Sequence, residues 1–481
     1  MDIDHDACYR AVKLRDARFD GRFFTAVKTT RIYCRPICPA RTPLSKNVTF
    51  FPTAAAAQEA GFRPCLRCRP ETAPDMGAWR GTSNTVSRGL ALIELGALDE
   101  ADVEALATRL GLGERQLRRL FREHLGASPI AVAQTRRILL AKQLVHETRL
   151  PMTEIAFAAG FGSIRRFNET FQSLYARPPS ELRRLAGADV PVADSGGISL
   201  LLRYQPPYDW AAMLEFLRLR AIPGIEHVAD GSYSRTFSVE GVQGTILVRP
   251  GAGNALQATV RTSKLSVLPR IIARIRRVFD LAADPLAISA HLATDPVLAP
   301  LVTKRPGLRV PGAWDGFELA IRAVLGQQIT VVAAIRLAGR LVAKYGERMK
   351  LSEGELTHVF PQAAALAHAK LGSLGMPASR AATLSAVAAA VAADPDFLGA
   401  HIGLEDAIKR LRSVRGVGEW TAQYIALRQL REPDAFPAAD IGLLRALTDG
   451  AGRRPVANEL LAQAEKWRPW RAYAAQHLWS S

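Results

Sequence analysis

The chain has 481 residues, and at roughly 100–200 residues per domain this length predicts three or four domains. With 48% hydrophobic and 22% charged residues it can bury several cores, and no stretch resembles a signal peptide or a membrane span, which argues against secretion and membrane insertion. The net charge of +18 is spread over the chain, with 29 basic and 21 acidic residues up to Asp194 and 34 and 24 after it, so nucleic acid is the favoured partner and the cytoplasm the expected location.

Four of the five cysteines form two close pairs near the N-terminus, Cys34 with Cys38 and Cys65 with Cys68. Each short turn can present two thiolates to one metal ion, and this spacing predicts a tetrahedral zinc site. Most such clusters are purely structural, and from spacing alone that alternative stays open. Cysteines arranged for a metal fit a reducing compartment. The fifth, Cys8, is expected to be a free thiol near a mobile terminus.

The residues around these cysteines resemble the N-terminal domain of the Ada family. The resemblance runs from about Phe19 to Pro70 and is carried by Phe24-Thr-Ala-Val-Lys-Thr-Thr-Arg-Ile-Tyr-Cys-Arg-Pro-Ile-Cys38 and Gly61-Phe-Arg-Pro-Cys-Leu-Arg-Cys68. It implies that Cys34 is both a zinc ligand and a nucleophile, which takes a methyl group irreversibly from a methylated DNA backbone phosphate. No cysteine follows Cys68, so the second methyl acceptor of full-length Ada proteins is absent.

The charge of such a site predicts a switch. Zinc with four thiolates has a formal charge of about −2, and methylation of one thiolate changes this to about −1. Repulsion between the site and neighbouring DNA phosphates then falls. We therefore expect affinity for a promoter to rise by roughly tenfold or more, because ~1.4 kcal/mol is enough.

Residues 71–84 have the composition of a linker, and two helix-turn-helix patterns follow it. The second helices are expected over 114–123 and 163–173, and a long amphipathic helix from about Ile130 to Glu147 joins the two units. A single pattern of this kind is often an ordinary helical hairpin, but two of them at this spacing are a stronger signal. The basic residues off the apolar faces are Arg115, Arg118, Arg119, Arg165 and Arg166.

The segment Ala158-Ala-Gly-Phe-Gly-Ser-Ile-Arg-Arg-Phe-Asn-Glu-Thr-Phe-Gln, with Pro178-Pro-Ser-Glu-Leu-Arg183, resembles the AraC family of activators. The resemblance implies that 114–123 and 163–173 enter successive major grooves of double-stranded promoter DNA. For an activator of this kind RNA polymerase is an expected partner, and we expect the protein to be a monomer.

A second linker is expected over 186–197, and the pattern then changes. Stretches near 237, 245 and 256 alternate apolar and polar residues between glycine-rich turns, which predicts antiparallel strands. From Ile271 to the C-terminus helical patterns dominate.

In this helical region Gly416-Val-Gly418 lies between two helical patterns, where bare backbone N–H groups could meet a DNA phosphate. The stretch from Leu411 to Asp440 resembles the helix-hairpin-helix glycosylases, and the wider span from Leu200 to Trp479 is similar to 3-methyladenine DNA glycosylases of the AlkA type. This implies that Asp440 stabilises positive charge on the sugar as the base departs. Alternatively, Asp440 only caps the following helix, although the two roles are compatible.

The same resemblance places Trp420, Tyr424 and Trp479 in the base pocket, where their faces suit a cationic alkylated base. Each aromatic taken alone could be a core residue. Relatives that also cut the backbone have a lysine where this chain has Trp420, so we expect hydrolysis without strand cleavage. The chain departs from the family pattern at Ala439, at Ile441 and at Gln328, which occupies the position of the DNA wedge.

The predicted protein is multidomain and mainly α with α+β parts. Its domains are a small zinc domain (1–75), an all-α double helix-turn-helix domain (82–186), an antiparallel-sheet α+β domain (196–308) and an all-α helix-hairpin-helix glycosylase domain (309–481). The predicted function is an alkylation-damage response that combines methyl transfer, methylation-switched transcriptional activation and base excision. The alternative is a DNA-binding regulator whose C-terminal half only binds damaged DNA.

Overall fold

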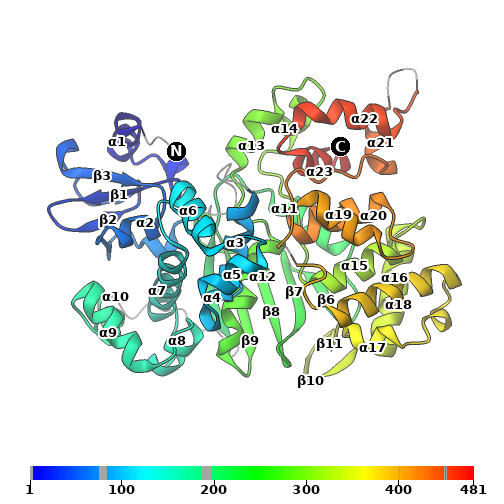
Figure 1. The fold of residues 1–481 in the computed structure, drawn as a ribbon, viewed down its shortest axis with the longest axis horizontal. Helices are drawn as coiled ribbons and strands as arrows, with labels where there is room; N and C mark the ends of the chain where they lie inside the picture. Colours follow the sequence, from blue (N-terminus) through cyan, green and yellow to red (C-terminus); the bar gives the residue numbers. More distant parts are fainter. Residues whose placement is uncertain (1–3, 75–83, 187–196, 400, 449, 451) are drawn as a thin grey trace. The chain divides into compact units, whose positions relative to one another are not determined.

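The computed structural model describes residues 4–74, 84–186, 197–399, 401–448, 450 and 452–481 (Figure 1). Most of the two predicted linkers lies outside these ranges. The chain forms two compact units, Met1–Gln205 with Gly251–Ala273 and Leu281–Ala283, and Pro206–Pro250 with Arg274–Asp280 and Asp284–Ser481. Within the described ranges no helix is long and apolar enough to cross a bilayer.

The first unit begins with a four-stranded sheet in the order β3-β1-β2-β4. Strand β1 is antiparallel to both β2 and β3, whereas β2 is parallel to β4. Buried aromatic side chains and the buried alanines of α2 form the core on one side. The elements are α1 (His5–Leu14), β1 (Phe24–Val27), β2 (Ile32–Cys34), β3 (Val48–Phe51), α2 (Ala54–Glu59) and β4 (Arg63–Pro64).

Cys8 differs from expectation. Its thiol is free, but it lies on α1 and packs in a small core with Phe23 and Phe50, and only 9% of its surface is exposed. Burial, together with the charge of Asp4, raises the pKa of Cys8 to about 11. It is therefore a core residue and not part of a mobile terminus.

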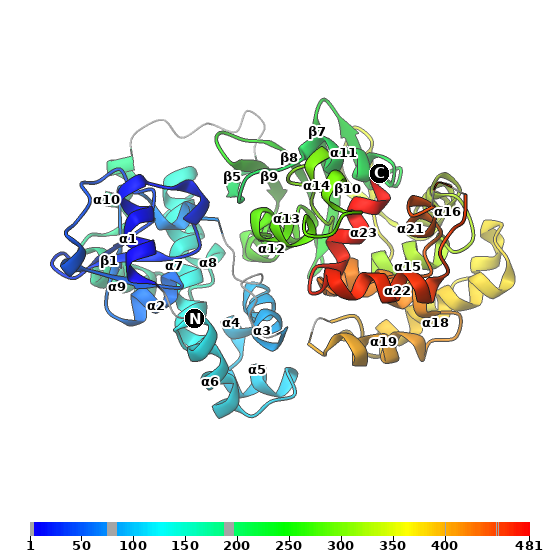
Figure 2. The ribbon, with the colours of Figure 1, turned by 90° about the horizontal axis from the view of Figure 1, so that it is seen from above.

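Eight helices follow, and they contain both predicted helix-turn-helix units. Each helix-turn-helix has its own buried core. In the first helix-turn-helix the core includes Leu106, Leu117 and Phe121, and in the second it includes Ile155, Phe167 and Phe171. Helix α7 lies beside α6, α8 and α10 and thereby joins the two (Figure 2). The helices are α3 (Asn84–Glu94), α4 (Ala97–Glu100), α5 (Val103–Arg109), α6 (Glu114–Leu125), α7 (Pro129–Glu147), α8 (Met152–Ala158), α9 (Ile164–Tyr175) and α10 (Pro179–Ala186).

Antiparallel strands follow the second linker, as expected. In the first unit β5 (Ile198–Arg203) pairs with β9 (Ala255–Thr262). In the second unit β7 (Ser232–Val239) lies between β6 (Glu226–Ala229) and β8 (Val242–Pro250). The helices of this part of the sequence are α11 (Trp210–Arg218), α12 (Leu268–Val278), α13 (Pro285–Leu292) and α14 (Ala299–Lys304).

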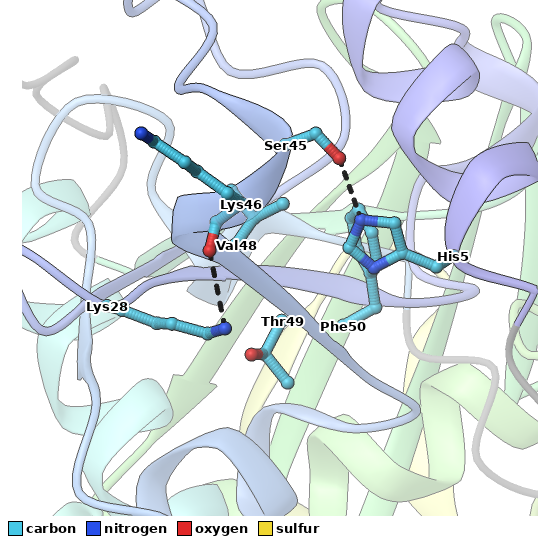
Figure 3. Close-up of a pocket in the computed structure, with 7 residues that line it drawn as sticks. All are labelled: His5, Lys28, Ser45, Lys46, Val48, Thr49 and Phe50. Atoms are coloured by element: carbon cyan, nitrogen blue, oxygen red, sulfur yellow. Dashed lines mark hydrogen bonds between the residues drawn. The ribbon is translucent and has the colours of Figure 1, made fainter.

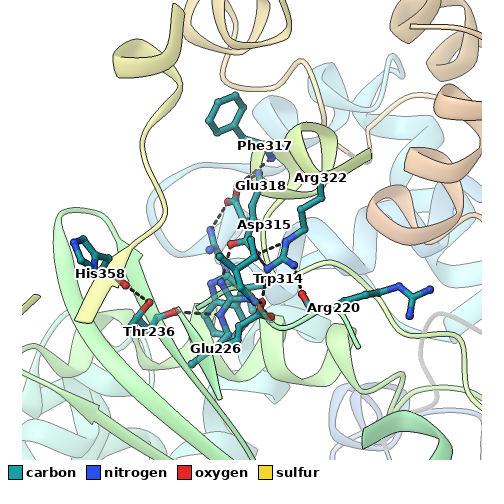
Figure 4. Close-up of polar contacts among 12 residues, drawn as sticks. Arg220, Glu226, Thr236, Trp314, Asp315, Phe317, Glu318, Arg322 and His358 are labelled. Atoms are coloured by element: carbon teal, nitrogen blue, oxygen red, sulfur yellow. Dashed lines mark hydrogen bonds and ion pairs between the residues drawn. The ribbon is translucent and has the colours of Figure 1, made fainter. Parts of the chain in front are cut away.

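A buried charge network joins β6 and β7 to α15 (Gly316–Leu325) (Figure 4). Arg322 pairs with Glu318 at 2.7 Å and with Glu226 at 2.5 Å, and Arg235 pairs with Glu318 at 2.7 Å. Burial opposes ionisation, but the two arginine charges lower the pKa of Glu318 to about 2. Glu318 therefore stays ionised at neutral pH, and its ion pairs with Arg235 and Arg322 fix α15 against the strands.

Helices make up most of the remaining second unit, and α15 packs against α16, α18 and α20. One hairpin, β10 with β11, was not expected in this helical region. Gly354, with φ +56, closes its turn, and Leu356 and Val359 are buried. The elements are α15 (Gly316–Leu325), α16 (Val331–Tyr345), β10 (Glu347–Glu353), β11 (Leu356–Val359), α17 (Ala363–Ala367), α18 (Ala378–Ala393), α19 (Leu404–Arg412), α20 (Glu419–Ile425), the π-helix η6 (Ala426–Leu430), α21 (Ile441–Ala446), α22 (Ala457–Ala464) and α23 (Arg471–Trp479).

Candidate functional site

The four clustered cysteines converge because of the strand pairing. Parallel pairing of β2 with β4 sets Tyr33 opposite Pro64, so Cys34 and Cys65 follow side by side at the same end of the two strands. A turn closed by the Cys38 N–H and the Arg35 carbonyl brings Cys38 back towards Cys34. All four Sγ atoms lie within 4.8 Å of one another.

This donor set fits zinc. Tetrahedral coordination at ~2.3 Å requires sulfur–sulfur distances of roughly 3.8 Å, which the cluster reaches with small adjustments. Backbone N–H groups of Arg35 and Arg67 donate to Cys68 Sγ and Cys65 Sγ, both at 3.3 Å, as expected for sulfurs that act as thiolates. Cys65 and Cys68 are buried, whereas Cys34 and Cys38 keep part of their surface exposed.

Two buried ion pairs support the cysteine loops. Arg35 pairs with Asp20 and also donates to the Cys68 carbonyl at 3.3 Å. Lys142, on α7, donates to the Glu71 carboxylate at 2.8 Å and to the Cys65 carbonyl at 3.3 Å, and the side chains of this pair are fully buried. The metal site is therefore joined directly to the helix that connects the two helix-turn-helix units.

The five predicted DNA-contacting arginines lie on α6 and α9 and away from their cores. Arg115, Arg119, Arg165 and Arg166 are exposed and Arg118 is partly exposed. Arg118 pairs with Glu114 at 2.5 Å and Arg165 with Glu169 at 2.8 Å, each one turn along the helix. These exposed pairs contribute little stability, so both arginines can exchange partners for phosphate or base edges.

The glycine hairpin lies between α19 and α20. Gly416 has φ +89, a conformation that favours glycine, and a Cβ added there would lie 1.9 Å from Thr383 Oγ1. Gly418 is the N-cap of α20 and is exposed, and a Cβ added there would meet no atom within 4 Å. The first glycine is thus required by the fold, whereas the second leaves the first turn of α20 open to a ligand.

Alanine substitutions should separate these two roles. Gly416→Ala should lower the free energy of unfolding by about 2–4 kcal/mol, because it combines left-handed strain with a steric overlap. Gly418→Ala should change it by no more than about 0.5 kcal/mol but weaken binding to DNA that contains an abasic site. Urea unfolding and a binding titration measure the two effects. Unchanged DNA affinity in Gly418→Ala would contradict a phosphate contact at the hairpin.

Asp440 lies beside the hairpin helix and accepts four hydrogen bonds. Its Oδ1 accepts the backbone N–H groups of Gly442 and Leu443 at 2.8 and 3.1 Å, so Asp440 does cap α21. Both predicted tryptophans also donate to it, Trp420 Nε1 to Oδ2 at 2.7 Å and Trp479 Nε1 to Oδ1 at 2.8 Å. These four donors fix the orientation of the carboxylate. The carboxylate remains partly exposed.

The three predicted aromatic residues form one cluster around this carboxylate. The rings of Trp420 and Tyr424 are stacked, with centroids 5.4 Å apart and an interplanar angle of 13°. Trp479 meets Tyr424 edge-on at 6.4 Å and 68°. Each of the three keeps part of its surface exposed. We refer to Trp420, Tyr424 and Trp479 as the aromatic cluster; its faces can stack on a planar base.

The loop before α16 reaches the hairpin through Gln327. Its Nε2 donates to the Gly416 carbonyl at 3.1 Å and to Thr421 Oγ1 at 2.9 Å. Gln328 is exposed and has φ +58, an uncommon conformation for a residue other than glycine. Ala439 is exposed and Ile441 is 61% exposed, so both side chains that depart from the family pattern face solvent beside Asp440.

Two surface hollows do not involve any predicted site residue. One of about 640 Å³ lies along β3, where Lys28 donates to the Lys46 carbonyl at 3.4 Å (Figure 3). The other, of about 800 Å³, lies among α8, α9 and the start of α10. Neither is lined by a clustered cysteine, by Asp440 or by the aromatic cluster.

Sequence reasoning missed several residues of the site. Arg428 follows Trp420 and Tyr424 at intervals of four residues, and Arg220 follows Phe216 at the same interval. Residues spaced in this way share a helix face, so spacing could have added Arg428 to the site. No comparable signal identified Lys142, because its partner Glu71 lies 71 residues away.

Four family models match the chain in succession. They are the metal binding domain of Ada (residues 7–71), a helix-turn-helix domain (106–185), the AlkA N-terminal domain (199–315) and the HhH-GPD superfamily of base excision DNA repair proteins (321–471). The Ada match, together with the four-cysteine cluster, indicates that the bound metal is zinc.

Relatives match over long stretches. The chain is 42% identical, over its whole length and 97% of the relative, to a Mycobacterium tuberculosis protein named "Probable bifunctional transcriptional activator/DNA repair enzyme AlkA". Over 58% of this chain and 95% of the relative it is 35% identical to DNA-3-methyladenine glycosylase 2 of Escherichia coli. The solved 3-methyladenine DNA-glycosylase of Archaeoglobus fulgidus superposes with a TM-score of 0.52 at 21% identity, over 58% of this chain and 97% of that one, which establishes likeness of fold.

Proposed function

Because the chain belongs to the family of bifunctional AlkA-type transcriptional activators and DNA repair enzymes, we propose that it removes alkyl damage from DNA by two separate reactions and reports the damage to transcription. It has an Ada-like methyl-transfer zinc domain, an AraC-type helix-turn-helix segment and an AlkA-like glycosylase domain. The observation that carries the proposal is that one chain contains both a four-cysteine cluster and a carboxylate that accepts two indole N–H groups.

The first reaction is methyl transfer to Cys34. Bound zinc keeps the cysteines ionised at neutral pH. Cys34 Sγ forms a bond to the methyl carbon of a phosphotriester, the methyl–oxygen bond breaks, and the phosphate diester leaves as an anion. Cys65 and Cys68 are buried, so the exposure of Cys34 and Cys38 limits the acceptor to the first pair, and the Ada resemblance selects Cys34.

The helix-turn-helix segment supplies binding to double-stranded promoter DNA. Helices α6 and α9 present Arg115, Arg119, Arg165 and Arg166 to solvent, where they can reach phosphates and base edges. The loss of one negative charge at Cys34 then favours the bound state. We further propose that the activated protein works as a cytoplasmic monomer and engages RNA polymerase.

The second reaction is hydrolysis of the bond between sugar and base. Gly416 and Gly418 lie where backbone N–H groups can hold a phosphate, and the exposed Gln328 can fill the space left by an extruded base. The aromatic cluster stacks on that base. Asp440 faces the sugar and stabilises the positive charge that develops there as the base leaves.

Base release without strand cleavage is the expected result on methylated duplex DNA. Trp420 occupies the position where strand-cutting relatives have lysine, so no amine is available there to form a Schiff base. Chromatography should detect free 3-methyladenine, and a denaturing gel should show intact strands until alkali is added. Damage-specific binding with no release would favour the regulator alternative. Borohydride trapping of the protein on DNA would contradict the purely hydrolytic reaction.

A further inference from the structure

Arg428 places a positive charge against the aromatic cluster. Its guanidinium carbon lies 4.5 Å from the ring centroid of Phe216, 5.3 Å from that of Trp479 and 5.6 Å from that of Tyr424. The residue is 3% exposed, and its two terminal nitrogens donate to the Pro311 carbonyl and to Gln476 Oε1, both at 3.0 Å. The buried Nε–H has no acceptor among the residues that the structure describes.

This charge is permanent at neutral pH. Burial lowers the pKa of Arg428 to about 10, which still leaves the guanidinium protonated. Burial also acts to raise the pKa of the Tyr424 hydroxyl, but the charges of Arg428 and Arg220 overcome it and lower the pKa. The guanidinium carbon of Arg220 lies 3.9 Å from the ring centroid of Phe216. Arg322 of the buried network donates to the Arg220 carbonyl at 2.7 Å (Figure 4). Both arginines therefore contact the Phe216 ring, and the charges of both act on Tyr424.

The same cluster also contacts the carboxylate of Asp440, which accepts the indole N–H groups of Trp420 and Trp479. A base that stacks on these rings thus lies near cations, while the sugar lies near an anion. When the glycosidic bond breaks, its electron pair leaves with the base, and water adds to C1′ and supplies the balancing proton. A base that starts neutral becomes an anion, which nearby cations stabilise, whereas an alkylated base that starts cationic becomes neutral and gains less.

We infer that Arg428 is a specificity-determining residue that favours the release of neutral bases, which leave as anions, relative to bases that already carry a positive charge. The inference rests on the proposed glycosylase function. It also modifies the simple picture of the aromatic cluster as a cage for a cationic base, because the rings of Tyr424 and Trp479 already face the guanidinium of the protein itself.

The test compares two duplexes under single-turnover conditions, one with a single hypoxanthine and one with a single 7-methylguanine. Arg428→Met keeps the approximate length of the side chain and removes its charge. It should lower the rate for hypoxanthine at least about tenfold more than the rate for 7-methylguanine. Arg428→Lys retains the charge and should preserve most of the wild-type ratio. Arg220→Met should shift the ratio in the same direction by a smaller factor, and it provides a second route if Arg428→Met folds poorly.

The matched control is Arg431→Met. Arg431 is three residues further on, and it donates to the Val310 carbonyl at 2.7 Å and pairs with Asp280. Its loss should lower both rates in equal proportion. An equal loss for both bases in Arg428→Met, an unchanged ratio, or a wild type that releases 7-methylguanine but no hypoxanthine would each overturn the inference. A wild type that releases neither base would instead refute the proposed function.

Discussion

Asp440→Asn should slow release of 3-methyladenine from methylated DNA by a factor of about 10²–10³ or more, the size of effect seen when a preorganised electrostatic group is removed. Asparagine caps helices about as well as aspartate, so the free energy of unfolding should change by less than about 1 kcal/mol. Single-turnover kinetics on wild type and variant give the rate ratio, and thermal unfolding gives the stability.

The hydrogen bonds of Asp440 call for a second variant. All four of its partners are donors, so an asparagine amide that keeps its oxygen towards Gly442, Leu443 and Trp479 must turn its –NH₂ towards Trp420. That clash could displace the indole and reduce activity for a reason other than charge. Asp440→Asn combined with Trp420→Phe removes the clash, and the loss of activity should persist. Recovery in the double variant, or a single variant within about threefold of wild type, would show that the carboxylate charge is not the catalytic element.

Part of the fold and part of this site could be predicted from the sequence. Short-range patterns were informative: cysteine spacing predicted the metal cluster, and apolar periodicity predicted both helix-turn-helix units close to their observed bounds. The hairpin glycines could be named from their place between two helical patterns, and Asp440 from the resemblance to the helix-hairpin-helix glycosylases. The roles assigned to individual residues remain predictions.

Contacts between residues far apart in the chain could not be predicted from the sequence. Neither Glu71 nor Lys142 is unusual in its local context, and only the packing of α7 against the metal loops brings them together 71 residues apart. In the same way, the spacing of Arg428 from Tyr424 relates it to one helix face, but its contacts with Pro311 and Phe216 come from distant parts of the chain. The β10–β11 hairpin was missed because β11 has only two buried residues, Leu356 and Val359, and their spacing of three does not give the alternation typical of a strand.

Cys34→His should abolish methyl uptake from DNA methylphosphotriesters, whereas Cys38→His should retain it. Both residues are partly exposed and belong to the same metal cluster, and histidine can replace a cysteine as a zinc ligand. The two variants thus differ in the predicted nucleophile but not in the number of ligands. After reaction with methylated DNA, mass spectrometry should find one added methyl group in wild type and in Cys38→His, mapped to Cys34. Zinc analysis should find one ion in all three proteins.

Wild type and Cys34→His together test the charge switch. Methyl transfer should make the metal site less negative in wild type, but not in Cys34→His, which lacks the predicted acceptor thiolate. Wild type should bind its promoter roughly tenfold more tightly after methylation, which corresponds to ~1.4 kcal/mol of reduced repulsion, and the gain should shrink as salt increases. Cys34→His starts with one thiolate fewer, so its affinity should already be raised and should not respond to methylated DNA. Methylation of wild type with no change in affinity would rule out the electrostatic account while leaving the repair reaction intact. Methyl uptake by Cys34→His would move the nucleophile to Cys38, the other partly exposed member of the cluster.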